Sequence, residues 1–269
     1  MVKNSPLNQE FVDSIKWISL VSKFRNFMSK QGFLEVSSHT NDLEIIAACE
    51  NHKAIASTTL GGKKLPLPQT AQMLLEFLIF LYTLLKKNIS KIWTQSISYR
   101  DEDITDDGRH LRLFSMFEVE ALGSFIDMTA FLNEFAQEFF GSEPYWVSYE
   151  RALELCGNTT GVLTEDDETT LFTALENILG KEPKVIALHN FPQESNPYFN
   201  MERNADGTAI KVDLLVKSKS TGKALEIGGF AKRCSDRALI LKRFIEQTEG
   251  EYAKTLHKLF GMSATQASL

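Results

Sequence analysis

A short stretch near the middle of the chain gathers residues that can hold a nucleotide. Apolar residues alternate along 114–120, which predicts the second strand of a hairpin with a polar loop before it. An arginine binds a phosphate in fork geometry, a carboxylate accepts from an exocyclic amine, and an aromatic ring stacks on a base. The residues that could do this are Arg100, Glu102, Arg109, His110 and Phe114. A solvated hairpin with surface ion pairs is the alternative that this pattern leaves open.

A second hairpin is predicted further along the chain, from two apolar strands at 212–216 and 225–229. The first strand carries Asp213, and the second carries Glu226 shortly before a pair of glycines. Glycines permit a close approach of backbone to ligand. Because Mg²⁺ prefers a few carboxylates together with phosphate oxygens and water, the pair indicates a magnesium site. Two surface carboxylates without a metal are the alternative.

One further carboxylate stands inside the most apolar segment of the chain. Glu76 lies within 73–85, which is too short to span a bilayer and is predicted to be a buried helix. An unpaired buried carboxylate is costly. Glu76 should therefore have a partner, either an arginine or a substrate amine.

Helices and strands around these residues must position them. Apolar residues at three- and four-residue spacing predict helices at 8–30, 127–140, 165–179 and 238–247, and a strand is expected at 33–36. The second of these helices carries an aromatic stripe, which is typical of core packing rather than of a cofactor site.

Composition narrows the class of protein. With 269 residues, of which 43% are hydrophobic, the chain can bury one large core or two modest ones. A net charge of -6 argues against broad electrostatic capture of nucleic acid. Three widely spaced cysteines indicate neither a disulfide framework nor a zinc site. No secretion signal is apparent at the N-terminus, so we expect a cytoplasmic protein without a membrane segment.

The first hairpin resembles motif 2 of the class II aminoacyl-tRNA synthetases, in their asparaginyl/aspartyl branch. That motif has Arg-x-Glu on one strand, then an Arg-His-Leu loop, then a Phe and a Met-x-Glu-x-Glu strand, as at 100–102, 109–111 and 114–120 here. The resemblance implies an ATP site that contains Arg100, Glu102, Arg109, His110 and Phe114.

Other segments resemble the same branch. Residues 32–36 are similar to motif 1, which builds the dimer interface of the family and implies a homodimer. The segment 67–72 is similar to a Leu-Pro-x-Ser-x-Gln run whose glutamine touches the amino acid. The runs 213–216 and 226–229 are similar to segments whose acidic residues bind Mg²⁺-ATP. An amino-acid-binding arginine follows them in the family, at the position of Lys232 here.

The site residues that the resemblance implies form three groups. The metal ligands are Asp213 and Glu226. The residues that bind the amino acid are Gln72, Glu76, Glu118, Gly228, Gly229 and Lys232. The catalytic residues are Arg100 and Lys232.

The resemblance implies one α/β domain over residues 1–269, with a mainly antiparallel sheet flanked by helices. We expect ATP- and Mg²⁺-dependent activation of an amino-acid carboxylate, aspartate or asparagine-like, as an adenylate. Transfer to an amine, ammonia or another small acceptor would follow, as in ammonia-dependent asparagine synthetase. No counterpart of motif 3 or of the anticodon-binding module is found, which argues against tRNA as the partner. A non-catalytic paralogue that binds an amino acid or a protein is the main alternative, and a tRNA ligase is the weakest.

Overall fold

The computed structural model describes residues 14–37, 55–101, 111–195 and 198–248. The helices are α1 (Ser14–Lys30), α3 (Gln72–Leu84), α4 (Phe125–Phe140), α5 (Tyr149–Cys156), α6 (Glu165–Leu179), η2 (Gln193–Ser195, a 3₁₀ turn) and α7 (Arg237–Thr248). The strands are β1 (Leu34–Glu35), β2 (Ser57–Leu60), β3 (Lys63–Pro66), β4 (Lys91–Tyr99), β5 (Leu113–Ala121), β6 (Tyr145–Ser148), β7 (Ile186–Phe191), β8 (Ala209–Lys217) and β9 (Ala224–Ala231).

The predicted motif 2 hairpin is formed by β4 and β5. These strands pair antiparallel without a register shift, from Lys91 opposite Ala121 to Tyr99 opposite Leu113. The short strand β1 adds to the other edge of β4 in parallel, which completes a three-stranded sheet in the order β1-β4-β5. A separate antiparallel hairpin is made by β2 and β3.

The second predicted hairpin belongs to another sheet, whose order is β6-β7-β8-β9. Its first pair is parallel and the other two pairs are antiparallel. The expected α/β fold with mainly antiparallel strands flanked by helices is confirmed, and the strands are divided among more than one sheet. The strands β6 and β7 had no separate signal in the sequence, because β6 is short and runs directly into α5.

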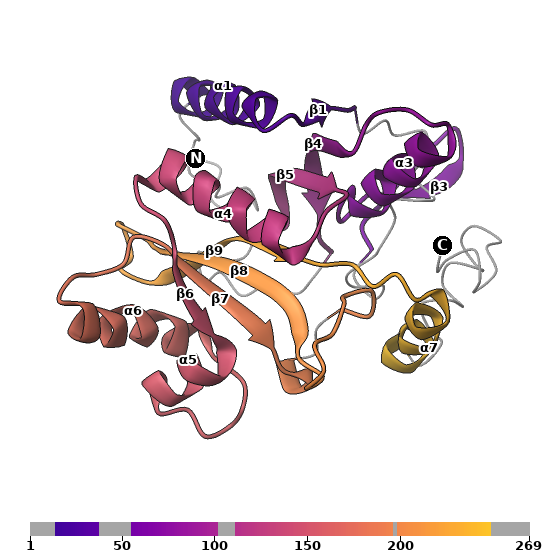
Figure 1. The fold of residues 1–269 in the computed structure, drawn as a ribbon. Helices are drawn as coiled ribbons and strands as arrows, with labels where there is room; N and C mark the ends of the chain where they lie inside the picture. Colours follow the sequence, from indigo (N-terminus) through magenta and orange to yellow (C-terminus); the bar gives the residue numbers. More distant parts are fainter. Residues whose placement is uncertain (1–13, 38–54, 102–110, 196–197, 249–269) are drawn as a thin grey trace, which may run out of the picture.

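Helix α4 lies between the two sheets (Figure 1). Phe131 and Phe135 pack against α1 and Trp93 on one side, and against the cluster that contains Val212 and Leu214 on the other. The predicted aromatic stripe is therefore core packing, as expected. The helix begins two residues before the predicted Asp127, because Ser124 and Asp127 form a capping box.

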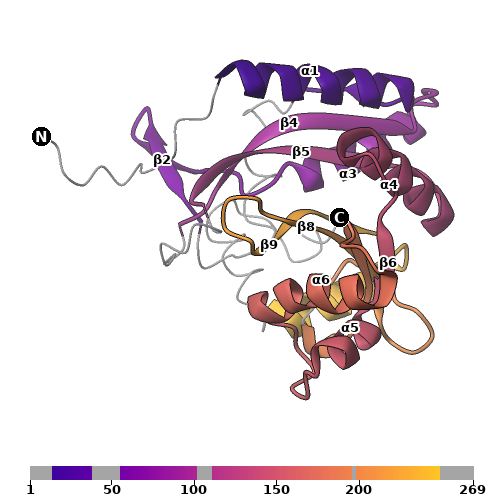
Figure 2. The same ribbon diagram turned by 90° about the vertical axis from the view of Figure 1, so that its left-hand side faces the viewer.

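The opposite face of the second sheet is covered by α5 and α6 (Figure 2). Leu171, Phe172 and Leu175 of α6 pack there against Leu215 of β8. The predicted helix at 165–179 matches α6, whose Thr164 forms a second capping box with Asp167.

Helix α1 covers the first sheet, where its Phe24, Phe27 and Met28 pack around Trp93. Arg25 of the same helix donates three hydrogen bonds of 3.0–3.1 Å to the carboxylate of Glu35 in β1. The part of the predicted helix that precedes residue 14 lies outside the described residues. None of the described helices is long and apolar enough to cross a bilayer.

Candidate active site

The hairpin of β4 and β5 brings Arg100 and Phe114 together. The guanidinium carbon of Arg100 lies 5.9 Å from the centroid of the Phe114 ring. Arg100 Nε donates to Ser98 Oγ at 2.9 Å, and Ser98 in turn donates to the carbonyl oxygen of Gln69 at 2.7 Å. A cation and an aromatic ring thus stand side by side at the end of the hairpin. The other predicted ATP ligands, Glu102, Arg109 and His110, lie outside the described residues.

Glu118 of β5 is buried beneath the first turn of α3. Its carboxylate accepts from Thr70 Oγ1 at 2.6 Å and from the backbone N–H of Ala71 at 2.7 and 2.6 Å. The first turn of α3 contains no acidic residue of its own. Glu118 therefore supplies the negative charge that the N-terminus of a helix favours. Both of its oxygens are engaged in this contact, and its role toward a substrate stays a prediction.

Glu76 has the arginine partner that its place on an apolar helix required. Arg233 Nε lies 2.9 Å from Glu76 Oε1. Asn200 completes a triangle, because it accepts from Arg233 at 3.0 Å and donates to Glu76 at 3.5 Å. Burial raises the pKa of Glu76, and the charge of Arg233 opposes that shift.

A second carboxylate, Glu120 of β5, faces the same ion pair. Gln72 of α3 donates a hydrogen bond to Glu120. Burial raises the pKa of Glu120 to about 7, and the negative charge of Glu76 adds to the shift while Arg233 and Gln72 oppose it. Gln72, Glu76, Glu120, Asn200 and Arg233, here called the Arg233 cluster, thus hold two acidic groups around one cation.

Lys232 is not part of the Arg233 cluster. Its side chain is exposed. Its backbone forms hydrogen bonds with the backbone of Glu202 and of Ile210 in neighbouring segments. Because successive residues of an extended chain point to opposite sides, Arg233 faces Glu76 and Lys232 faces away. Arg233, and not Lys232, is therefore the neighbour of Glu76. The role of Lys232 toward a substrate stays a prediction.

Asp213 and Glu226 converge on one face of the second sheet. A Cβ atom added to Gly229 would lie 3.1 Å from Asp213 Oδ1 and 3.2 Å from Glu226 Oε1. The Oδ1 atom of Asp213 is buried and has no hydrogen-bond partner among the described residues. The Oδ2 atom is 2.6 Å from Lys211 Nζ. Burial and the charge of Glu226 raise the pKa of Asp213, and Lys211 opposes the shift.

A β-bulge brings these two carboxylates together. Leu214 pairs with Gly228, but the next residue, Leu215, pairs with Glu226, so that Ile227 is left without a partner on β8. Residues that are opposite each other in a sheet share a face. Without the extra residue, Glu226 would point to the face opposite to Asp213.

The Asp213–Glu226 pair fits a divalent cation in its donor chemistry. One buried carboxylate oxygen has no partner, and Gly229 leaves space where a side chain would crowd both acids. The described residues contain no group of three or more acidic, histidine or cysteine side chains that could hold a metal by themselves. Phosphate oxygens and water would have to complete the shell of a magnesium ion, as is usual for Mg²⁺.

Comparison with known proteins identifies the family of the chain. The sequence pattern of the tRNA synthetases class II (D, K and N) matches residues 13–266. The chain belongs to this family. No curated protein sequence matches the chain.

Solved structures of class II synthetases have a similar fold. One is the asparaginyl-tRNA synthetase from Pyrococcus horikoshii complexed with asparaginyl-adenylate, with a TM-score of 0.66 and 20% identity over 90% of this chain and 58% of that chain. Another is the Entamoeba histolytica asparaginyl-tRNA synthetase in complex with asparaginyl-adenylate, with a TM-score of 0.63 and 15% identity over 94% of this chain and 64% of that chain. The chain thus spans less than two thirds of the length of either synthetase. At such identities the likeness shows the fold alone.

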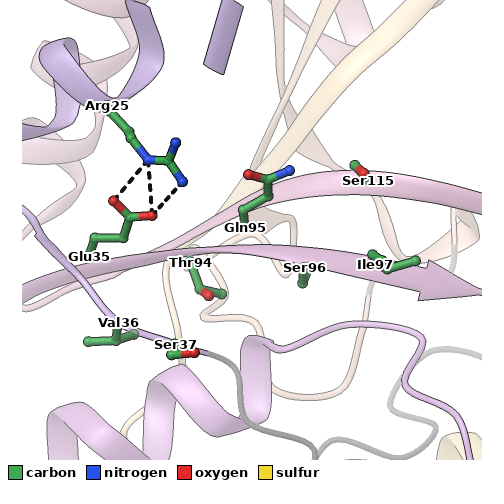
Figure 3. Close-up of a pocket in the computed structure, with 9 residues that line it drawn as sticks. All are labelled: Arg25, Glu35, Val36, Ser37, Thr94, Gln95, Ser96, Ile97 and Ser115. Atoms are coloured by element: carbon green, nitrogen blue, oxygen red, sulfur yellow. Dashed lines mark hydrogen bonds and ion pairs between the residues drawn. The ribbon is translucent and has the colours of Figure 1, made fainter. Parts of the chain in front are cut away.

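An open pocket lies beside β4 (Figure 3). Its lining contains none of the residues assigned to ATP, metal or amino acid. The lining residues are Arg25, Glu35, Val36, Ser37, Thr94, Gln95, Ser96, Ile97 and Ser115. The ion pair of Arg25 and Glu35 spans one side of it, and residues of β4 and β5 form the rest of the lining together with Val36 and Ser37.

Sequence reasoning missed four residues of the Arg233 cluster and of the surroundings of the Asp213–Glu226 pair. Glu120 and Arg233 were assigned no role, although each is close in sequence to a predicted site residue. Asn200, which lies in a turn, and Lys211, which lies near the start of β8, gave no signal, since single polar residues beside apolar runs are common. Only the alternation of Lys211 and Asp213 along one strand could have indicated an ion pair.

Proposed function

We propose that the chain activates the carboxylate of an amino acid, aspartate or asparagine-like, as an adenylate. A carboxylate oxygen of the amino acid would attack the α-phosphorus of ATP, and pyrophosphate would leave. An amine, ammonia or another small acceptor would then attack the activated carbonyl, and AMP would leave. The observation that carries the proposal is the Arg233 cluster, because it offers fixed charges of both signs in a chain of adenylate-forming family and fold.

At the nucleotide end, Arg100 would bind the α-phosphate and Phe114 would stack on adenine. Their proximity, at 5.9 Å, supports a shared ligand. The Ser98 contact orients the guanidinium before a ligand arrives, which reduces the entropy lost on binding. Glu102, Arg109 and His110 would complete this end of the site.

At the amino-acid end, Arg233 would bind the substrate carboxylate, for which its planar fork is suited. Glu76 and Glu120 would accept from the amine or amide groups of the substrate. We assign this role to Arg233 in place of Lys232, whose side chain is exposed. Gln72 would orient Glu120, to which it is hydrogen-bonded. Glu118, Gly228 and Gly229 would support this end of the site.

A magnesium ion at Asp213 and Glu226 would neutralise charge that develops on the phosphates. Asp213 Oδ1 and Glu226 Oε1 are the atoms that would hold it, since both lie beside Gly229. The role of the protein there is to present two oxygens on one face, which the bulge at Ile227 achieves.

We also infer a homodimer formed through α1 and β1. Large apolar side chains on these elements are exposed to solvent, with Ile15 at 75%, Ile18 at 63% and Leu34 at 47%. Sedimentation velocity distinguishes this dimer from a monomer.

The test is amino-acid-dependent exchange of pyrophosphate into ATP, with Mg²⁺ and each common amino acid in turn. Exchange with one amino acid would establish adenylation and name the substrate. Hydroxylamine would then trap the activated carbonyl, and its replacement by ammonia, small amines or total tRNA would identify the acceptor. Arg100→Ala should abolish ATP binding in calorimetry, whereas Arg112→Ala, at an exposed position of the same hairpin, should not.

Two results would contradict the proposal. Retained ATP affinity in the Arg100→Ala variant would exclude the proposed nucleotide site. ATP binding without exchange for any amino acid would favour the second candidate, a non-catalytic paralogue. The contact that favours this second candidate is the Lys211 ammonium on Asp213, because it occupies one oxygen of the proposed metal ligand.

A further inference from the structure

Lys211 is held in a fixed position beside the proposed metal ligands. Its ammonium lies 2.6 Å from Asp213 Oδ2 and 4.2 Å from the centroid of the Phe191 ring. The side chain of Asp213 is 7% exposed and that of Lys211 is 23% exposed, so water screens their attraction only weakly. This is a desolvated ion pair rather than a surface contact.

Three carboxylates attract the ammonium of Lys211. Asp213 and Glu226 act from β8 and β9, and Glu168 acts from the facing helix α6. The ammonium of Lys211 therefore offsets the negative charge of the Asp213–Glu226 pair, and that negative charge is what attracts a divalent cation.

We propose that Lys211 acts as a resident cation of the Asp213–Glu226 pair and lowers its affinity for divalent metal ions. This inference rests on the proposed function, which places Mg²⁺ at that pair. Asp213 Oδ1 and Glu226 Oε1 remain available to a metal, while Oδ2 stays with the ammonium. A divalent ion bound at Oδ1 would stand within a few ångströms of a second positive charge, and the repulsion weakens its binding.

The consequence is that metal binds firmly only when phosphates arrive with it. The triphosphate of ATP supplies the negative charge and the oxygens that the two acids lack. The free protein would therefore hold little metal at ordinary concentrations, and nucleotide and metal would enter together.

The experiment is a titration of the full chain with Mn²⁺ in the absence of nucleotide. Binding is measured as the loss of the free-ion signal in electron paramagnetic resonance. Lys211→Met should bind Mn²⁺ at least about tenfold more tightly than the wild type. Lys217→Met is the matched control, since Lys217 lies on the same strand and has its own ion pair with Glu182. Its affinity should equal that of the wild type. Lys211→Gln is the second variant if the methionine variant fails to fold.

The outcomes separate this inference from the proposed function. Suppose that the wild type and the Lys211 variants bind Mn²⁺ with equal affinity and that Asp213→Asn abolishes this binding. That result would overturn the role of Lys211 and leave the metal site intact. Weaker binding in the Lys211 variants would overturn it as well. Binding that Asp213→Asn does not change would overturn the metal site and the inference together. No binding to a folded Lys211 variant would overturn the role of Lys211, because that variant should bind Mn²⁺ without nucleotide.

Discussion

In the Arg233 cluster, the cation that balances Glu76 comes from a part of the chain more than 150 residues away, whereas Asp213 receives its cation from the same strand, two residues before it. The first arrangement exists only when α3 and the end of β9 are in place together. The second is present as soon as β8 is extended, because residues two apart share a face. The comparison teaches that the Arg233 cluster depends on the tertiary fold, while the charge of the Asp213–Glu226 pair is set mainly by local sequence.

The largest effect that tests this comparison is expected from Arg233→Met. It leaves Glu76 and Glu120 without their shared cation, and it also removes the link to Asn200. Because the pair is partly exposed, we expect a loss of about 2 kcal/mol in the free energy of unfolding, measured with urea at pH 7. Lys232→Met, the neighbouring exposed change, should cost less than about 0.5 kcal/mol. Similar losses in both variants would mean that the cluster does not depend on Arg233.

A smaller effect, and one that depends on pH, is expected from Glu120→Gln. The pKa of Glu120 is raised to about 7 in the folded chain, against about 4.3 for an unperturbed glutamate. Between these values the folded state binds more protons than the unfolded state, so the free energy of unfolding falls as pH rises through this window. Glutamine removes that decline and can still accept from Gln72. At pH 8 the free energy of unfolding of the variant should exceed that of the wild type by about 1 kcal/mol.

Urea unfolding at pH 5 and pH 8 measures this difference. Glu176→Gln makes the same chemical change at an exposed position of α6 and should leave the pH profile of the wild type unchanged. Parallel profiles for wild type and Glu120→Gln would show that Glu120 is not held in an unfavourable environment.

The smallest effect is expected from Gly229→Ala. The added Cβ would press on the ends of the Asp213 and Glu226 side chains, which can move apart. The free energy of unfolding should therefore change by less than about 1 kcal/mol, while the affinity for Mn²⁺ falls a few-fold. Gly228→Ala is the control, because its Cβ would meet the Phe230 ring at 3.0 Å instead. The Gly228→Ala variant should lose stability and keep its affinity for Mn²⁺. A loss of Mn²⁺ affinity in Gly228→Ala but not in Gly229→Ala would place the metal on the other face of the sheet.

The sequence was sufficient to predict the elements that carry strong local patterns. The alternation at 114–120 predicted β5, and the lone carboxylate on an apolar helix correctly predicted a partner for Glu76, which is Arg233. The sequence could not identify that arginine. Successive side chains after β9 point to opposite sides, and only the structure shows that Arg233 rather than Lys232 faces Glu76. Nor could the sequence predict the bulge at Ile227, since one extra residue in a strand leaves no mark in composition. The division of the strands among separate sheets left no sequence signal for a related reason, because it depends on pairings between distant segments.

Helix α4 has a consequence for how the chain unfolds. It supplies apolar side chains to the core beneath each sheet, and Phe131 and Phe135 belong to both. Neither sheet could lose its structure without exposing the side of α4 on which the other depends. We therefore expect the two layers to melt as one cooperative unit, with no stable intermediate that keeps one of them alone.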